Sequence, residues 1–419
     1  MSNSEDGYNA GVAGRERERP PINIVQRGNL KVIEETLRKQ WRLGQNMVLC
    51  WSSDERGLLV LLVPHYFLGN YSAQGSGDNE AFVRKLISGK RRTASEEMLK
   101  VAERLEVAPT FIKLNAPLDE EPGVLEAVEQ IIKRYGLSFV DRRAVLLFDI
   151  VDFSLHSPFE QASQLNSLSY SMNSAYNKLL TKGIEINFAR TTTGDGYYVW
   201  NRDLGPYSHQ DLFVFLLLVV ADNAAARAAS SGNTVPMIRS AYHIGSHYEL
   251  YQAEGVNPTV FSYIVGDVTI ELARMLDLAQ PGQLLIGDFE WLAEISADGA
   301  APLRSTPAFI RQCQRELQNL TGLQLARRSI TGMDCRLSDH HDEQGESHAR
   351  RFLITDKHGL TRHAYNLEAT IQLADGELQL GLDGQKIHCD VAAGESSTDA
   401  AEDLSGLLRK RAQKRITED

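Results

Sequence analysis

The 419-residue chain has few cysteines, no excess of basic residues and no apolar run long enough to cross a membrane. Its four cysteines lie far apart without a Cys-x-x-Cys pair, which argues against a disulfide or zinc framework and predicts reduced thiols. The formal net charge of −11 argues against a general nucleic-acid binder, because neutralising phosphates requires a basic surface. A triphosphate ligand stays possible, since a metal ion can supply positive charge.

The most apolar run, "LFVFLLLVVA" at 212–221, is about half of the roughly 20 residues that a membrane span requires. It continues into the helix-forming stretch "DNAAARAAS", so we predict a buried core helix. The first 21 residues, "MSNSEDGYNAGVAGRERERPP", are polar throughout and do not resemble a signal peptide. We therefore expect a soluble, cytoplasmic protein with no membrane partner.

Changes in composition predict the domain organisation. Residues 1–21 are expected to be disordered, and 22–138 to form a small α+β module of unknown role. A second domain over 139–390 carries a polar insertion at about 290–350, and 391–419 is a polar tail. The strands and helices predicted in the second domain follow the order β-α-β-β-α-β. This order is typical of a ferredoxin-like α+β fold, in which helices cover one face of an antiparallel sheet.

Two aspartates stand at positions where chemistry is expected. Asp149 interrupts the apolar run "LLFDIVDF", where a carboxylate is costly unless it is paired or binds a metal. Asp195 lies between two predicted strands in "TTGDGYY". If these strands are antiparallel neighbours, both carboxylates reach the same edge of the sheet, where with a triphosphate they suit Mg²⁺ or Mn²⁺. The alternative is that Asp149 caps the next helix and Asp195 is only a turn residue.

Several motifs in order resemble the catalytic domain of class III nucleotidyl cyclases. They are "FDIVDFS", "GDGYYV", "HIG", "VGDVTIELARML" and "PGQLLIGD", and together they span about 143–290. The stretch "DKHGLTRHAYNL" is similar to the closing strand of that family. The resemblance implies a homodimer with composite active sites at the interface. It also implies cyclisation of a nucleoside triphosphate to a 3′,5′-cyclic nucleotide with release of pyrophosphate.

The resemblance assigns the metal ligands. Asp149, Asp195 and the backbone carbonyl of Ile150 would bind two divalent ions, Mn²⁺ or Mg²⁺. One ion would lower the pKa of the ribose 3′-hydroxyl, and the other would steady the triphosphate.

The resemblance also assigns the phosphate contacts. Backbone amides of "VDFSL", among them those of Phe153 and Ser154, would bind the β- and γ-phosphates where the chain enters a helix. Arg274 of the opposite subunit would offset charge on the α-phosphate, and Lys357 would contact the terminal phosphate. Two positions depart from the family pattern: Asp152 replaces a glycine, and Ile270 replaces the asparagine that helps to orient the ribose.

The two positions that read the base in purine cyclases hold Thr191 and Tyr263 here. Neither matches the residues of adenylate or guanylate cyclases, so selectivity for a purine loses its usual hydrogen-bonding basis. The pattern resembles the pyrimidine cyclases of bacterial Pycsar anti-phage systems, whose product is read by a separate effector protein. We therefore expect UTP as substrate, ahead of CTP. An adenylate cyclase with a divergent pocket, or an inert nucleotide-binding module with the same fold, are the alternatives.

Other polar clusters favour structural roles. His243 lies on a predicted core strand, where a structural histidine is more common than a catalytic one. The stretch "SDHHDEQGESH" at 338–348 has no rigid ligand spacing and indicates a solvated loop, not a metal site.

Overall fold

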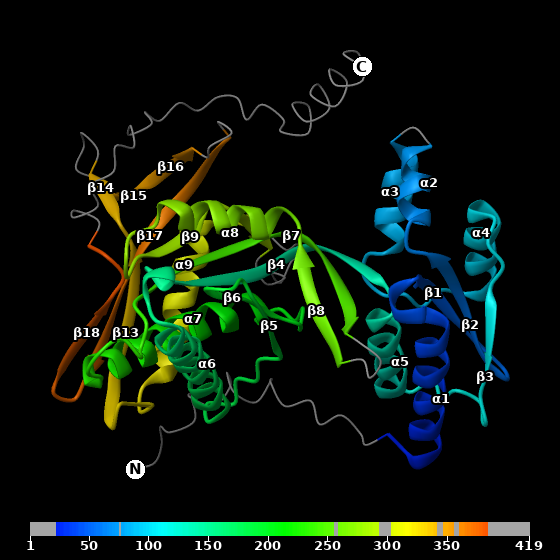
Figure 1. Cartoon of the computed structure of the whole chain (residues 1–419), viewed down its shortest axis with the longest axis horizontal. Coiled ribbons are helices and arrows are strands. Elements are labelled where there is room, and N and C mark those ends of the chain that lie inside the picture. Colours follow the sequence, from blue (N-terminus) through cyan, green and yellow to red (C-terminus); the bar gives the residue numbers. More distant parts are fainter. Residues whose placement is uncertain are drawn as a thin grey trace, which may run out of the picture.

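The computed structural model describes residues 22–74, 77–254, 259–292, 303–341, 347–355 and 360–383. The segment expected to be disordered, 1–21, and the polar tail expected at 391–419 lie outside these residues. The described chain forms an N-terminal group of helices and strands beside a larger body, and β4 and β7 extend from the larger body toward the smaller one (Figure 1).

The predicted β-α-β-β-α-β order is present in the larger body. Its elements are β4 (Leu137–Ile150), α6 (Pro158–Leu180), β5 (Phe188–Thr192), β6 (Gly196–Asn201), α7 (Ser208–Ala229) and β7 (Ile238–Glu254). The strands lie in the order β7-β4-β6-β5, and each is antiparallel to its neighbours. This is the ferredoxin-like arrangement, so the predicted α+β class and antiparallel sheet are confirmed.

Helices α6 and α7 pack on one face of this sheet. Leu146 and Phe148 of β4 meet Leu168 of α6 and Phe215 of α7 in the largest hydrophobic core. Helix α7 is long and apolar enough to cross a membrane by length and composition, but 67% of its most apolar stretch is buried. Its position at the centre of the core confirms the prediction of a buried core helix.

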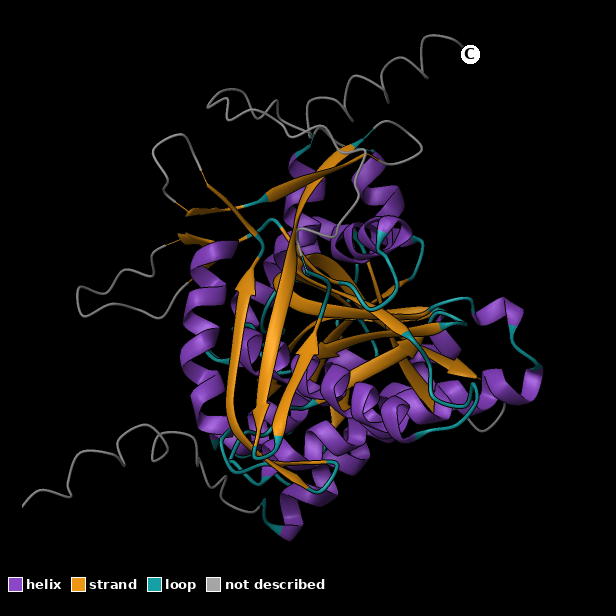
Figure 2. Cartoon of the chain, turned by 90° about the vertical axis from the view of Figure 1, so that its left-hand side faces the viewer, coloured by secondary structure: helices purple, strands orange, loops and turns teal. Residues whose placement is uncertain are grey.

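A further helix, α8 (Asp267–Leu278), covers the opposite face of the sheet. Val145 and Leu147 of β4 pack there against Val268 and Leu272. The prediction that helices cover only one face is therefore wrong for α8. The physical reason lies in the stretch Ala144–Phe148 of β4, whose successive residues are all apolar, so both faces of the strand need cover there. Figure 2 shows helices on both sides of the strands.

The sheet continues beyond β7 in two directions. β8 (Thr259–Val265) pairs with β7 as a long hairpin, and β9 (Leu284–Gly287) joins β7 in parallel. Beyond β9 the path runs through β17 (Thr361–Leu373) to β13 (Arg328–Leu337) and β12 (Gln324–Leu325). Both β16 (Arg351–Thr355) and β18 (Gly376–Leu380) pair with β17.

The expected polar insertion at 290–350 contributes to the core. It holds the short pairs β10 (Glu290–Leu292) with β11 (Leu303–Ser305) and β14 (Asp339–His341) with β15 (Ser347–Ala349), and the helix α9 (Thr306–Leu317). Phe309, Cys313 and Leu317 of α9 are fully buried, and β13 belongs to the main sheet. The polar composition hides this apolar stripe at a spacing of four residues. Part of the loop expected at 338–348, residues 342–346, lies outside the described chain.

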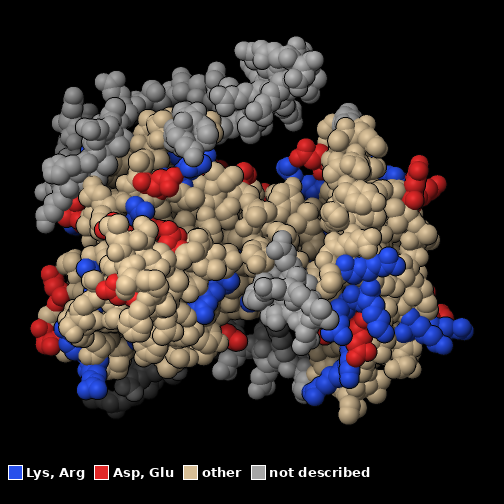
Figure 3. Space-filling view, viewed as in Figure 1, with Lys and Arg blue, Asp and Glu red and all other residues tan. Residues whose placement is uncertain are grey.

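The N-terminal elements surround a three-stranded antiparallel sheet in the order β1-β2-β3. They are α1 (Ile24–Trp41), β1 (Asn46–Asp54), β2 (Gly57–Pro64), α2 (Phe67–Ala73), α3 (Asp78–Leu86), α4 (Ser95–Leu105), β3 (Thr110–Lys113) and α5 (Pro122–Arg134). One cluster of apolar residues packs α1 and α5 together, and a second packs α3 and α4. On the face in Figure 3, basic and acidic side chains mix over the α1–α5 region, where Arg134 pairs with Glu34 at 2.8 Å.

A buried arginine links this group to the main sheet. Arg91 is 1% exposed, and its guanidinium donates to the carbonyl of Leu49 in β1 at 2.9 Å. The same guanidinium donates to the Ser138 hydroxyl of β4 at 3.1 Å. Its backbone amide donates to the Glu129 carboxylate of α5 at 2.7 Å. Arg91 therefore fixes the start of β4 to β1 and α5.

Candidate functional site

Asp149 and Asp195 come together at one end of the sheet. Asp149 lies near the end of β4, opposite Gly196 at the start of the antiparallel strand β6. The amide of Ile150 donates to the backbone carbonyl of Asp195 at 2.9 Å. The predicted convergence of the two aspartates is therefore present. The Asp149 side chain is 17% exposed, so it is accessible although its strand is buried.

The threonines and glycines before β6 build the turn that presents Asp195. Gly194 has a φ of +103°, which favours glycine, and its amide donates to the Thr192 hydroxyl at 3.1 Å. The Thr193 hydroxyl donates to Oδ1 of Asp195 at 3.2 Å. A Cβ on Gly196 would lie 1.9 Å from the Phe148 carbonyl oxygen, so only glycine allows this approach to β4.

The electrostatics around Asp149 suit a cation. Burial raises the pKa of Asp149, the hydrogen bond and charge of Arg239 oppose the rise, and the charges of Asp195 and Asp277 add to it. Bringing carboxylates together is unfavourable until a cation offsets their repulsion. In the described part of the chain no three His, Cys, Asp or Glu side chains gather as a metal cluster. An ion here would therefore take ligands beyond the two carboxylates, such as a backbone carbonyl and phosphate oxygens.

Arg239 is a site residue that the sequence analysis missed. It lies on β7 directly opposite Asp149, and its Nε donates to Asp149 Oδ2 at 2.6 Å. Its Nη1 donates to the carbonyl of Ala279, the residue that ends α8, at 2.9 Å. A charged residue in the mainly apolar stretch "MIRSAYHIG" was the local signal, but its partner depends on the register of β7 against β4, which the local sequence does not give.

The loop after β4 differs from the prediction. Phe153 and Ser154 open a short 3₁₀ helix, Phe153–Leu155, and do not belong to the long helix, because His156 is extended. The first amides of a helix have no acceptor within it, so those of Phe153 and Ser154 can still serve a ligand. Asp152 has a φ of +56°, a left-handed conformation that explains why glycine suits this position.

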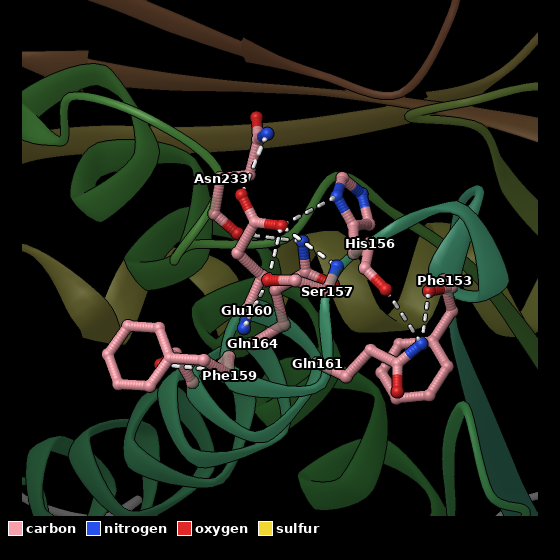
Figure 4. A network of polar contacts seen from close by, with 9 residues as sticks. Phe153, His156, Ser157, Phe159, Glu160, Gln161, Gln164 and Asn233 are labelled. Carbon is pink, nitrogen blue, oxygen red and sulfur yellow. Dashed lines mark hydrogen bonds and ion pairs between the residues drawn. The ribbon is translucent and has the colours of Figure 1, made fainter.

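The long helix α6 begins after this loop with its own cap. The Ser157 hydroxyl accepts from the Glu160 amide at 3.4 Å, and Glu160 Oε2 accepts from the Ser157 amide at 2.9 Å. Gln161 donates to the carbonyls of Phe153 and His156 at 3.1 and 3.0 Å, which fastens the loop to α6 (Figure 4). Asn233 donates to Glu160 at 3.1 Å, so the chain before β7 supports the same end of α6. The N-terminus of α6 is thus satisfied internally.

Arg274 lies on α8 between Ile270 and Leu278, and these three residues, each four positions apart, share one side of the helix. Ile270 and Leu278 are 48% and 57% exposed. Arg274 pairs with Asp277 at 3.1 Å. Glu271 is not on this side of the helix, and its carboxylate pairs with Arg362 at 2.6 Å. The structure therefore presents Arg274 on a partly exposed, partly apolar helix surface.

Thr191 and Tyr263 lie on strands of the same sheet but on opposite sides. Ala189 packs in the core beneath α8, and alternation along β5 places Thr191 on that side. Ile264 packs in the same core, so alternation along β8 places Tyr263 on the other side. Within one chain the two positions do not form a shared pocket wall. Lys357 lies outside the described residues.

His243 is buried and structural. Its pKa is lowered to about 4 by burial and by the charge of Arg362, and its ring packs directly on Gly287. Burial and the charge of Arg143 lower the pKa of His209 and His247 to about 4 as well. These three histidines are therefore neutral in the folded protein at neutral pH.

This neutrality predicts a loss of stability in mild acid. Histidines in the unfolded chain bind protons below their pKa of about 6.5, whereas these three histidines in the folded protein stay neutral. Each one therefore lowers the free energy of unfolding by about 1.4 kcal/mol for each pH unit below that value. We expect the free energy of unfolding in urea to fall from about pH 7 to about pH 5. His247→Gln should make this profile less steep, and His65→Gln, which replaces an exposed histidine, is the control for the substitution itself. A profile that is flat in the wild type would contradict the burial of neutral histidines.

Comparison with known proteins gives only distant structural overlaps. No family model matches this chain, and no curated protein matches it. The guanylate cyclase domain of RhGC from Catenaria anguillulae in complex with GTP is 13% identical, with 56% of this chain and 98% of that chain covered and a TM-score of 0.32. The adenylyl cyclase CyaB from P. aeruginosa is 10% identical, with 55% and 95% covered and a TM-score of 0.31. Overlaps this weak carry no argument alone, so the case for a function rests on the site's residues.

Proposed function

We propose that this protein is a nucleotidyl cyclase that converts a nucleoside triphosphate, preferably UTP, to a 3′,5′-cyclic nucleotide and pyrophosphate. The observation that carries the proposal is the meeting of Asp149 and Asp195 at the end of β4 and β6. Two carboxylates at the same end of two neighbouring strands, with loop amides beside them, suit a metal-bound triphosphate.

Some residues of the site would bind the metal ions, and others would bind the phosphates. Asp149, Asp195 and the carbonyl of Ile150 would hold two divalent ions, Mn²⁺ or Mg²⁺. When bound, these ions supply Lewis acidity at the ribose 3′-hydroxyl and at the triphosphate. The amides of Phe153 and Ser154 would bind phosphate oxygens, with Lys357 as a further contact. The 3′-hydroxyl would release its proton to solvent as its oxygen bonds to the α-phosphorus, and the bond from the α-phosphorus to the bridging oxygen of the leaving pyrophosphate would break.

We further propose that the active form is a homodimer in which Arg274 serves the site of the partner. Arg274 would stabilise charge that develops on the α-phosphate. The apolar residues that flank it on α8, Ile270 and Leu278, are about half exposed and could be covered by a partner. An arginine framed by apolar side chains is typical of the centre of a protein interface. The ribose would lack the usual asparagine contact, because Ile270 stands at that position.

The preference for a pyrimidine rests on the residue types of Thr191 and Tyr263 and not on a shared pocket, because within one chain the two lie on opposite sides of the sheet. A short hydroxyl and a bulky phenol replace the groups that read a purine, which supports UTP, with CTP as second choice and ATP as the alternative. A cyclic pyrimidine nucleotide would then act as a signal in anti-phage defence, read by a separate effector. The competing function is an inert module that only binds a nucleotide. The presence of Asp149, Asp195 and Arg274 together favours the enzyme.

Turnover of each of the four nucleoside triphosphates with Mn²⁺ tests this function. We expect pyrophosphate release and a cyclic product, identified by mass spectrometry, with UTP as the best substrate. Asp195→Asn should remove the product, because the second carboxylate is lost. No cyclic product from any nucleotide would leave only the inert module, and cyclic AMP as the main product would overturn the pyrimidine preference.

A further inference from the structure

We propose that Arg239 is a positioning residue that orients the Asp149 carboxylate for the divalent ion and couples it to the end of α8. This inference rests on the metal-binding role proposed above. In the proposed site Arg239 binds Asp149 and contacts neither the ion nor the nucleotide.

The contacts of Arg239 leave one carboxylate oxygen of Asp149 available. Arg239 Nε holds Oδ2 at 2.6 Å, and in the described part of the chain Oδ1 has no hydrogen-bond donor. The two residues face each other in register on β7 and β4, so the pair is fixed by the sheet. Their side chains are 28% and 17% exposed, so the contact is largely shielded from water. A carboxylate held by one oxygen presents the other in a fixed direction.

Among the described residues, Arg239 is the positive charge that acts on Asp149. Asp195 and Asp277 act on Asp149 with the same sign of charge, and Arg239 opposes them. Without Arg239 the side chain of Asp149 would be free to rotate away from its negative neighbours. Groups that hold a metal-binding side chain in place typically change metal affinity or activity by about 10- to 100-fold.

The second contact of Arg239 reaches the helix that carries Arg274. Nη1 donates to the carbonyl of Ala279 at the C-terminal cap of α8 at 2.9 Å. Carbonyls at the end of a helix lack partners within it, and a cation there is favourable. One guanidinium therefore joins the carboxylate on β4 to the end of α8. A lysine keeps the charge but has no planar fork, so it cannot hold both acceptors in the same geometry.

Mn²⁺ binding to the full chain, followed by electron paramagnetic resonance, tests this role without turnover. We expect Arg239→Gln to weaken Mn²⁺ binding by about tenfold or more, and Arg239→Lys to restore part of the loss. Arg227→Gln is the matched control, because Arg227 is an exposed arginine on α7 that contacts Met237. Circular dichroism should show that each variant is folded.

Turnover at rising Mn²⁺ concentration gives an independent check. Excess Mn²⁺ should restore much of kcat to Arg239→Gln but none to Asp149→Asn, because only the latter loses a ligand. Unchanged or tighter Mn²⁺ binding in Arg239→Gln would overturn the positioning role. Tighter binding would mean that Arg239 only neutralises Asp149 and so competes with the ion for the carboxylate. If Asp149→Asn binds Mn²⁺ as the wild type does, the metal assignment itself fails, which separates the two failures.

Discussion

Asp149→Asn is expected to lower turnover by about a thousandfold, because it removes a charged ligand from the proposed ion site. Asparagine has nearly the same shape and can still accept the hydrogen bond from Arg239 Nε, so we expect the fold to persist. The measurement is the rate of cyclic product formation at saturating nucleotide and Mn²⁺. Light scattering should show the same oligomeric state as the wild type.

Asp141→Asn provides the matched control for this experiment. Asp141 lies on the same strand, β4, and its side chain is exposed. This variant should keep wild-type turnover. An Asp149→Asn enzyme within tenfold of the wild type would contradict the role of Asp149 in catalysis.

Gly196→Ala is expected to cost about 3 kcal/mol of unfolding free energy and to reduce turnover to background. The new Cβ would lie 1.9 Å from the Phe148 carbonyl oxygen and 3.1 Å from the Asp149 Cα. Both atoms belong to the backbone of a central strand, so they cannot move aside without breaking the pairing of β4 with β6. Because Asp195 precedes this glycine, the same displacement moves the second carboxylate.

Gly205→Ala separates this steric effect from the general effect of replacing a glycine. A Cβ on Gly205 meets no atom within 4 Å, and we expect a nearly unchanged urea midpoint. Equal stability of the two variants would show that β6 does not approach β4 as closely as the structure has it.

Much of the site could be predicted from the sequence because it depends on local patterns. A carboxylate in an apolar run and another in a glycine turn indicate two strand ends, and strand pairing then brings Asp149 and Asp195 together. The same reasoning could not find Arg239, because its role depends on the register of β7 against β4, which no local pattern determines.

The differences in the fold have a similar origin. Whether helices cover one face of the sheet or both depends on which residues of β4 are apolar. In the stretch Ala144–Phe148 every residue is apolar, so the sequence does not indicate a single buried face. The polar composition of 306–317 concealed a helix whose apolar residues recur every four positions. The 3₁₀ turn at Phe153–Leu155 ends at the extended residue His156. The local signals for that break, which the prediction did not use, were Ser157 with Glu160, a capping box, and Pro158 at the first position of α6.

The measurement that tests the central claim most directly is a competition between the four nucleoside triphosphates. The full chain would receive equal amounts of ATP, GTP, CTP and UTP with Mn²⁺, and mass spectrometry would identify the cyclic products. We predict cyclic UMP as the main product, and its loss in both Asp149→Asn and Asp195→Asn. The absence of every cyclic nucleotide, or a product that survives both substitutions, would contradict the proposed cyclase site.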